Sequence, residues 1–174
     1  MKSEEETATA MEILIIYDSE FGNTARIAEA IAQGARAAAA DADHVALYHI
    51  GDVRSEQATA ADVLIIGSPT QGFRPTAPVR ALLSKMPRNG LAGKAVATFD
   101  TRFTEEEIKS IGRMLSTMVD LFGYAAPRIA DTAGKKGARL IAPPEGFYVG
   151  GKEGPLLEGE LERAEAWGAR LLGE

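Results

Sequence analysis

Short apolar runs alternate along this chain with longer segments in which apolar residues recur every three or four positions. The run at 13–16 is too short for a helix and lacks alternation, so it predicts a strand buried on both faces. Segments 62–67 and 94–100 have the same character, while 44–50 is rich in β-branched and aromatic residues. With a fifth strand at 138–142, separated from the others by helical segments, the pattern predicts an α/β protein with a parallel sheet.

The helical segments each show one apolar face. Helical spacing follows residue 24 and returns at 76–86, at 126–135 and at about 157–172. A further helix is expected from Thr104, which forms a capping-box pattern with Glu107, to Phe122. Its apolar residues fall on one stripe, so we interpret this helix mainly as additional core; a lid or a dimer face is the alternative.

Composition limits the classes of function. The chain has 174 residues, suits one domain, and is 45% hydrophobic, which excludes a disordered chain. Nineteen basic against 25 acidic residues leave a net charge of −6, so nucleic acid is not an expected partner. Without cysteine there is no disulfide, iron–sulfur cluster or thiolate zinc site, and redox chemistry would need a bound cofactor.

The first ten residues differ in character from the rest. Residues 1–10 include three consecutive glutamates and no apolar run, so we interpret them as a flexible acidic tail rather than a signal peptide or membrane anchor. A single domain at 11–174, no membrane insertion and a cytoplasmic location are therefore expected. His44 and His49 lie five apart in a strand, on opposite faces, so a shared metal site is not expected.

The turn after the first strand carries the main candidate chemistry. Residues 18–24 connect the strand to a helix whose free backbone N–H groups and positive dipole end point toward the loop. Ser19 and Thr24 add hydroxyl donors, and Gly22 permits a backbone that curls around a phosphate. The alternative is that Ser19, Asn23 and Thr24 only cap the helix.

The segment Tyr17-Asp-Ser-Glu-Phe-Gly-Asn-Thr24 resembles the phosphate loop of flavodoxins, in which two hydroxyl residues separated by one residue precede Gly-x-Thr. Phe21 replaces the second hydroxyl residue. Gly67-Ser-Pro-Thr70 resembles the start of a loop that flanks the isoalloxazine ring in that family, and 100–104 follows in the expected order. The resemblance implies a flavodoxin-like, doubly wound, five-stranded parallel sheet of order 2-1-3-4-5 with helices on both faces. It also implies noncovalent FMN rather than FAD, because one phosphate loop is present and no G-x-G-x-x-G fingerprint opens the sheet.

The implied FMN contacts come from the three loops at the carboxyl ends of the strands. They are Ser19, Glu20, Phe21, Gly22, Asn23, Thr24, Ser68, Pro69, Thr70, Gln71, Gly72, Phe73, Asp100, Thr101, Arg102 and Phe103. No catalytic side chain and no metal ligand are predicted.

The ring loops depart from the family in two ways. Flavodoxins commonly stack tryptophan and tyrosine on the ring, whereas this chain offers Phe73 and Phe103, which are stacking residues or ordinary packing anchors. Arg74 and Arg102 lie where acidic residues are usual, so they are expected to stabilise the anionic, fully reduced flavin unless they are solvated or paired. A helix at 104–123 resembles an insertion after the third loop.

The resemblance implies an electron carrier between redox proteins, a reductase and an acceptor, and a homodimer is compatible with it. One alternative is an FMN-dependent reductase of quinones or other small acceptors. Another is an interaction module without flavin. Gly146 through Lys152 nearly matches a nucleotide-triphosphate loop, but Glu153 stands where a hydroxyl is required, so that function is not expected.

Overall fold

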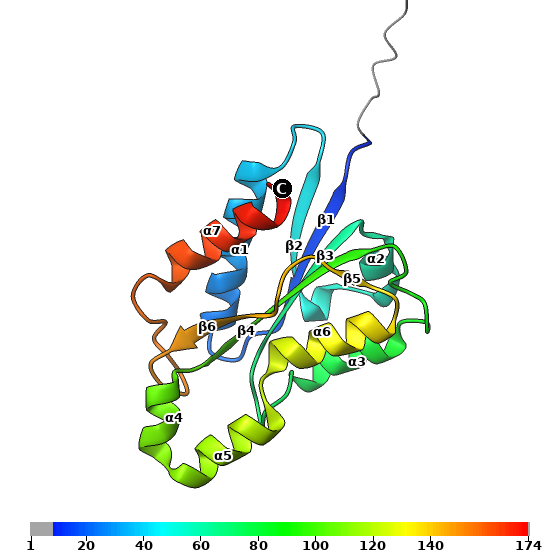
Figure 1. The fold of residues 1–174 in the computed structure, drawn as a ribbon. Coiled ribbons are helices and arrows are strands. Elements are labelled where there is room, and N and C mark those ends of the chain that lie inside the picture. Colours follow the sequence, from blue (N-terminus) through cyan, green and yellow to red (C-terminus); the bar gives the residue numbers. More distant parts are fainter. Residues whose placement is uncertain (1–8, 174) are drawn as a thin grey trace, which may run out of the picture.

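A computed structural model describes residues 9–173 and confirms the doubly wound α/β fold (Figure 1). β1 (Glu12–Tyr17) lies between β2 (His44–His49) and β3 (Val63–Pro69), and β4 (Ala95–Phe103) pairs with β3. All four strands are parallel, so their carboxyl ends meet at one edge of the sheet. The predicted order 2-1-3-4-5 is confirmed.

The edge of the sheet beside β4 is formed by two short strands, where the sequence predicts one. The expected strand at 138–142 is reduced to β5 (Arg139–Leu140), and the chain pairs with β4 again as β6 (Glu145–Val149). Pro143 and Pro144 stand between the two, and proline has no N–H to donate to a ladder. The described sheet therefore has six strands, of which β5 and β6 share one edge position.

Helices cover both faces of the sheet. α1 (Asn23–Ala38) and α7 (Glu160–Leu172) lie on one face, and α3 (Ala77–Lys85) and α6 (Ala125–Lys135) lie on the other (Figure 1). A short turn, η1 (Ile50–Asp52), and a short helix, α2 (Ser55–Ala60), join β2 to β3.

The two hydrophobic cores explain why the first strand has no polar alternation. Ile13 and Ile15 belong to the core under α1 and α7, whereas Leu14 and Ile16 belong to the core under α3 and α6. Successive residues of a strand point to opposite faces of the sheet, and helices cover both faces, so all four side chains are buried. The run at 13–16 therefore predicted a central strand correctly.

The α1–α7 contact is unusually close. Trp167 is 4% exposed and its ring packs edge-on against Phe99 and Phe147. A Cβ atom on Gly168 would collide with the carbonyl of Ile31, so this glycine allows the two helix backbones to meet.

The helix expected over 104–122 is instead two helices. α4 (Glu105–Ile111) is capped by Thr104, whose hydroxyl accepts the Glu107 N–H at 3.1 Å, and α5 (Arg113–Phe122) follows after a break. Gly112 makes this break with φ of 152° and ψ of 157°, a combination that essentially only glycine adopts. The pair projects from the body of the protein (Figure 1).

The expectation that this segment adds to the core is wrong for α5. No residue of α5 is buried, and Ile108 is the buried residue of α4. Met114 and Leu121 are 79% and 74% exposed. The break at Gly112 divides the apolar stripe, so part of it faces solvent.

Three expectations concern the tail and the histidines. The proposed tail at 1–10 lies almost wholly outside the described residues. Within residues 9–173, no helix is both long and apolar enough to cross a bilayer, and no cluster of three potential ligands forms a metal site. His44 contacts Glu12 at 3.0 Å and His49 contacts Asp18 at 3.3 Å, so the two histidines have separate partners.

Candidate cofactor site

A cavity of about 560 Å³ lies at the carboxyl ends of the parallel strands, within the size range of small-molecule sites. All three loops singled out in the sequence contribute to its wall. The predicted residues that line it are Glu20, Phe21, Asn23, Thr24, Pro69, Thr70, Gln71, Gly72, Phe73, Thr101, Arg102 and Phe103.

Four predicted residues do not line the cavity but shape its loops. The Ser19 hydroxyl accepts the N–H groups of Gly22 at 3.1 Å and Ala25 at 3.3 Å, which holds the turn in place. Gly22 has φ of 90°, a left-handed conformation that suits glycine. Ser68 is fully buried, and its hydroxyl accepts the Thr76 N–H at 3.0 Å. The fourth, Asp100, is described below.

The loop at 19–24 presents unused donors to the cavity. In the described chain, the backbone N–H groups of Glu20, Phe21, Asn23 and Thr24 have no hydrogen-bond acceptor within the protein. α1 begins at Asn23, so the positive end of its dipole lies at the same place. Convergent free N–H groups at a helix start favour an anion such as a phosphate.

The neighbouring hydroxyls are tied to one another. Thr24 Oγ1 lies 2.8 Å from Thr101 Oγ1, and both side chains are buried, which fixes the start of α1 against the end of β4. Asn23 Nδ2 donates to the Glu153 carbonyl at 3.1 Å. This bond brings the loop containing Lys152 to the cavity wall.

Arg102 is paired with a carboxylate, which is the alternative that the sequence left open for it. Its Nε and its second terminal nitrogen donate to the two Asp100 carboxylate oxygens at 2.6 and 2.7 Å. Its guanidinium carbon lies 3.8 Å from the centre of the Tyr124 ring. A Cβ on Gly146 would overlap the guanidinium, so the glycine leaves room for it. Arg74, by contrast, is exposed and makes no ion pair in the described structure.

Asp100 holds Arg102 in place but does not itself line the cavity. The side chain is fully buried and also accepts the Ala126 N–H at 2.8 Å. Burial raises the pKa of Asp100, while the hydrogen bonds and charge of Arg102 and the Ala126 N–H act in the opposite direction. Asp100 therefore positions Arg102, Tyr124 and the start of α6 rather than reaching the cavity.

Apolar side chains from the other loops also line the cavity. Phe73 and Phe103 both line it, and the Phe73 ring packs against Phe122 with centroids 5.7 Å apart. The pattern of a cavity with anion donors from one loop and apolar walls from others suits a ligand with an anionic end and a flat apolar end.

Sequence reasoning missed several lining residues. These are Ile108, Leu115, Val119, Gly123, Tyr124, Val149 and Lys152. The apolar spacing of 104–122 was recognised but assigned to the core. Lys152 was noticed only within the rejected nucleotide-triphosphate pattern, and no local pattern places Tyr124 beside Arg102.

Comparison with known proteins agrees with the fold. The flavodoxin family model matches residues 15–167. A flavodoxin of Aquifex aeolicus (strain VF5) is 30% identical over 171 residues, which cover 91% of this chain and 84% of that protein.

Solved structures show the same fold. An archaeal flavodoxin superposes with a TM-score of 0.68 at 20% identity, covering 93% of this chain and 96% of that one. Oxidised flavodoxin 1 of Bacillus cereus gives 0.69 at 18% identity, covering 92% and 97%. The family match and the Aquifex relative carry the assignment beyond the fold: the chain belongs to the flavodoxin family, whose members bind FMN.

Proposed function

We propose that this protein carries electrons between a reductase and an acceptor protein, working in the cytoplasm, with FMN held in the cavity at the sheet edge. The free N–H groups of Glu20, Phe21, Asn23 and Thr24 would hold its phosphate, and the loops at 68–73 and 100–103 would hold its ring. The observation that carries this proposal is the set of four unpartnered N–H groups beside a cavity with apolar walls.

The residues present fit FMN. No lysine or arginine lies between Ser19 and Thr24, so the phosphate is bound by backbone dipoles, and the Ser19 hydroxyl fixes the loop geometry. The replacement of a hydroxyl by Phe21 removes one donor, but the Phe21 N–H remains free. When bound, FMN supplies reversible electron exchange. The chain itself binds and orients the flavin and excludes water from it.

A visible spectrum of the purified protein, with chromatographic identification of the released flavin, tests this proposal. We expect FMN in a one-to-one ratio, or its recovery when the apoprotein is mixed with FMN. Failure to bind FMN after reconstitution would instead favour the interaction module without flavin, and preferential binding of FAD would contradict the single phosphate loop.

A second candidate is an FMN-dependent reductase of quinones or other small acceptors. One observation favours it: Ile108, Leu115 and Val119, from α4 and α5, add an apolar wall to the cavity. Such a wall suits a flat apolar acceptor. Sustained turnover of a quinone with reduced nicotinamide and no separate reductase would favour the enzyme over the carrier.

A further inference from the structure

One face of this acidic protein is strongly basic. Residues 77–94 and 125–136, which form α3, the loop after it and α6, hold seven cations and one carboxylate, a net charge of +6. The remaining residues hold twelve cations and 24 carboxylates, a net charge of −12. We call the first set the basic face. Such a separation of charge creates a local potential opposite in sign to that of the whole molecule.

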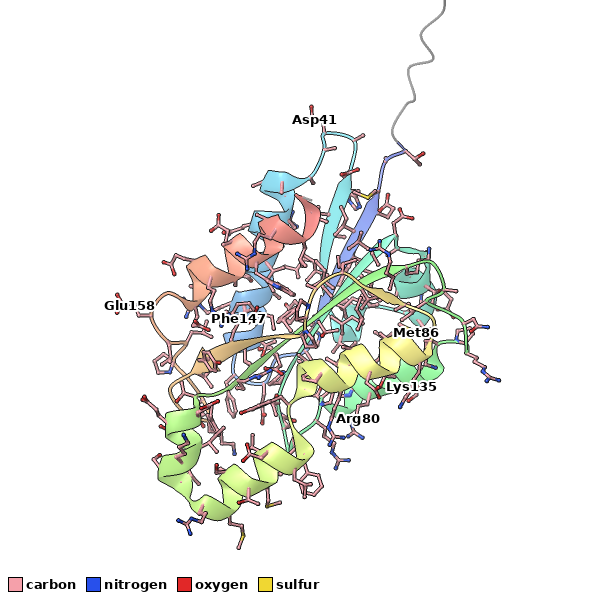
Figure 2. All side chains as sticks on the ribbon, viewed as in Figure 1. Asp41, Arg80, Met86, Lys135, Phe147 and Glu158 are labelled. Carbon is pink, nitrogen blue, oxygen red and sulfur yellow. The ribbon has the colours of Figure 1, made fainter. Side chains whose placement is uncertain are left out.

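The cations of the basic face are largely free of carboxylates. Within residues 9–173, its one ion pair joins Lys135 to Asp131 at 2.9 Å. Arg80, Lys85 and Arg88 are exposed and have no carboxylate oxygen within 4.0 Å among the residues that the structure describes. Figure 2 shows Arg80 and Lys135 on α3 and α6. The positive charge is therefore available to a partner.

Favourable interaction with helix dipoles explains only some of the cations on the basic face. Lys85 and Lys135 lie in the last turns of their helices, where a cation is favourable. Arg128 lies in the first turn of α6, where a cation is unfavourable, and it donates to the Phe122 carbonyl at 2.8 Å. Lys136 donates to the Met86 carbonyl at 2.6 Å, which joins the ends of the two helices.

The basic face begins at the rim of the cofactor cavity. α6 starts directly after Tyr124, and the Ala125 N–H donates to Thr70 Oγ1 at 3.0 Å. Tyr124 and Thr70 both line the cavity. Exposed Arg74 lies in the same loop as Thr70 and extends the positive charge to this rim. A partner seated on the basic face would lie beside the cavity.

We infer that the basic face docks a partner protein through an acidic surface on that partner. Charge complementarity identifies the occupant. The described residues of α3 and α6 include no exposed large hydrophobic side chain, whereas interfacial helices insert an apolar face into the membrane and proteins that bind single-stranded nucleic acid stack the bases on aromatic rings. The −12 charge of the rest of the chain would repel a polyanion longer than the face. That the partner exchanges electrons rests on the proposed function.

A pair of double variants tests the inference. Lys85→Glu/Arg88→Glu reverses two exposed charges whose side chains make no hydrogen bond or ion pair in the described structure. Arg36→Glu/Arg170→Glu makes the same change in charge on the α1–α7 face and serves as the control. A short fluorescent glutamate-rich peptide is the probe, and its anisotropy is measured at about 10 mM salt, where screening is weak.

We expect the peptide to bind the wild type and the control equally, and to bind Lys85→Glu/Arg88→Glu about tenfold more weakly. Equal weakening in both double variants, or no binding by the wild type, overturns the inference. Tighter binding of phosphatidylserine vesicles or duplex DNA than of the peptide also overturns it, in favour of a membrane or nucleic acid. FMN binding by the same variants is measured in parallel; a protein that binds the peptide but not FMN refutes the proposed function and leaves the docking face intact.

Discussion

Replacing Arg102 with alanine should strongly destabilise the protein, even without a bound ligand. Asp100 is fully buried, and Arg102 is its only ion-pair partner in the described chain. Removing the partner of a buried charge typically costs about 3–5 kcal/mol. We therefore expect Arg102→Ala to lower the free energy of unfolding in urea by about 3–5 kcal/mol at about pH 7. Arg74→Ala, in the adjacent loop, should change it by less than about 0.5 kcal/mol.

The loss of stability caused by Arg102→Ala should grow as the pH rises. The pKa of Asp100 is raised in the folded protein by burial, and removing Arg102 removes an influence that lowers it. The folded variant then holds a proton that the unfolded chain has released, so its stability falls as the pH rises above the ordinary aspartate value of 3.8. The difference from wild type should shrink as the pH falls toward that value.

Two results would refute this reasoning. One is an Arg102→Ala protein within about 1 kcal/mol of wild type at about pH 7. The other is a double variant, Asp100→Asn/Arg102→Ala, that is no more stable than Arg102→Ala, because removing the buried charge should recover part of the loss.

Three further predictions concern packing and the first loop. In urea titrations, Gly168→Ala should lower the free energy of unfolding by about 1–3 kcal/mol, because its Cβ would meet the backbone of α1. Gly134→Ala should raise it by about 0.5–1 kcal/mol, because Gly134 lies in α6 with open space around the added Cβ. Gly22→Ala should weaken FMN binding by about 1–2 kcal/mol, measured by flavin fluorescence quenching, because its φ of 90° is strained for alanine; riboflavin, which lacks the phosphate, should lose less. Met114→Glu/Leu121→Glu should leave the thermal midpoint nearly unchanged, because both side chains are exposed; a large drop would mean that α5 is packed in solution.

The central sheet could be predicted because its residues face two cores at once. A run such as 13–16 has no polar position, and that pattern arises where both faces of a strand are covered. The strand order came from the family resemblance rather than from periodicity, whereas the strand-turn-helix pattern at 13–24 already marked the first loop as a candidate anion site. The edge strand was harder because tertiary pairing with β4 continues past Pro143 and Pro144, where the local sequence indicates only an end.

The sequence could predict which loops form the candidate site, but not most of the contacts between individual residues in it. Asp100 and Arg102 are two residues apart in β4, and residues at this spacing share a face of a strand, so their pairing had a signal in the sequence. The break at Gly112 had none, because a glycine inside a helical pattern is often tolerated. Tyr124 and Lys152 reach the cavity through tertiary contacts between distant segments, which periodicity does not encode.

The central claim is that the loop at 19–24 binds the phosphate of FMN, and the most direct measurement compares FMN with riboflavin. Ser19→Ala/Thr24→Ala removes the hydroxyl that holds the turn and the hydroxyl that ties the start of α1 to β4. We expect the double variant to bind FMN more weakly by about 1–4 kcal/mol, since it loses three neutral hydrogen bonds that hold the loop and its free N–H groups in place, each contributing about 0.5–1.5 kcal/mol and not strictly additively. Riboflavin should bind nearly as it does to wild type. Equal weakening of both ligands would show that this loop is not the phosphate site.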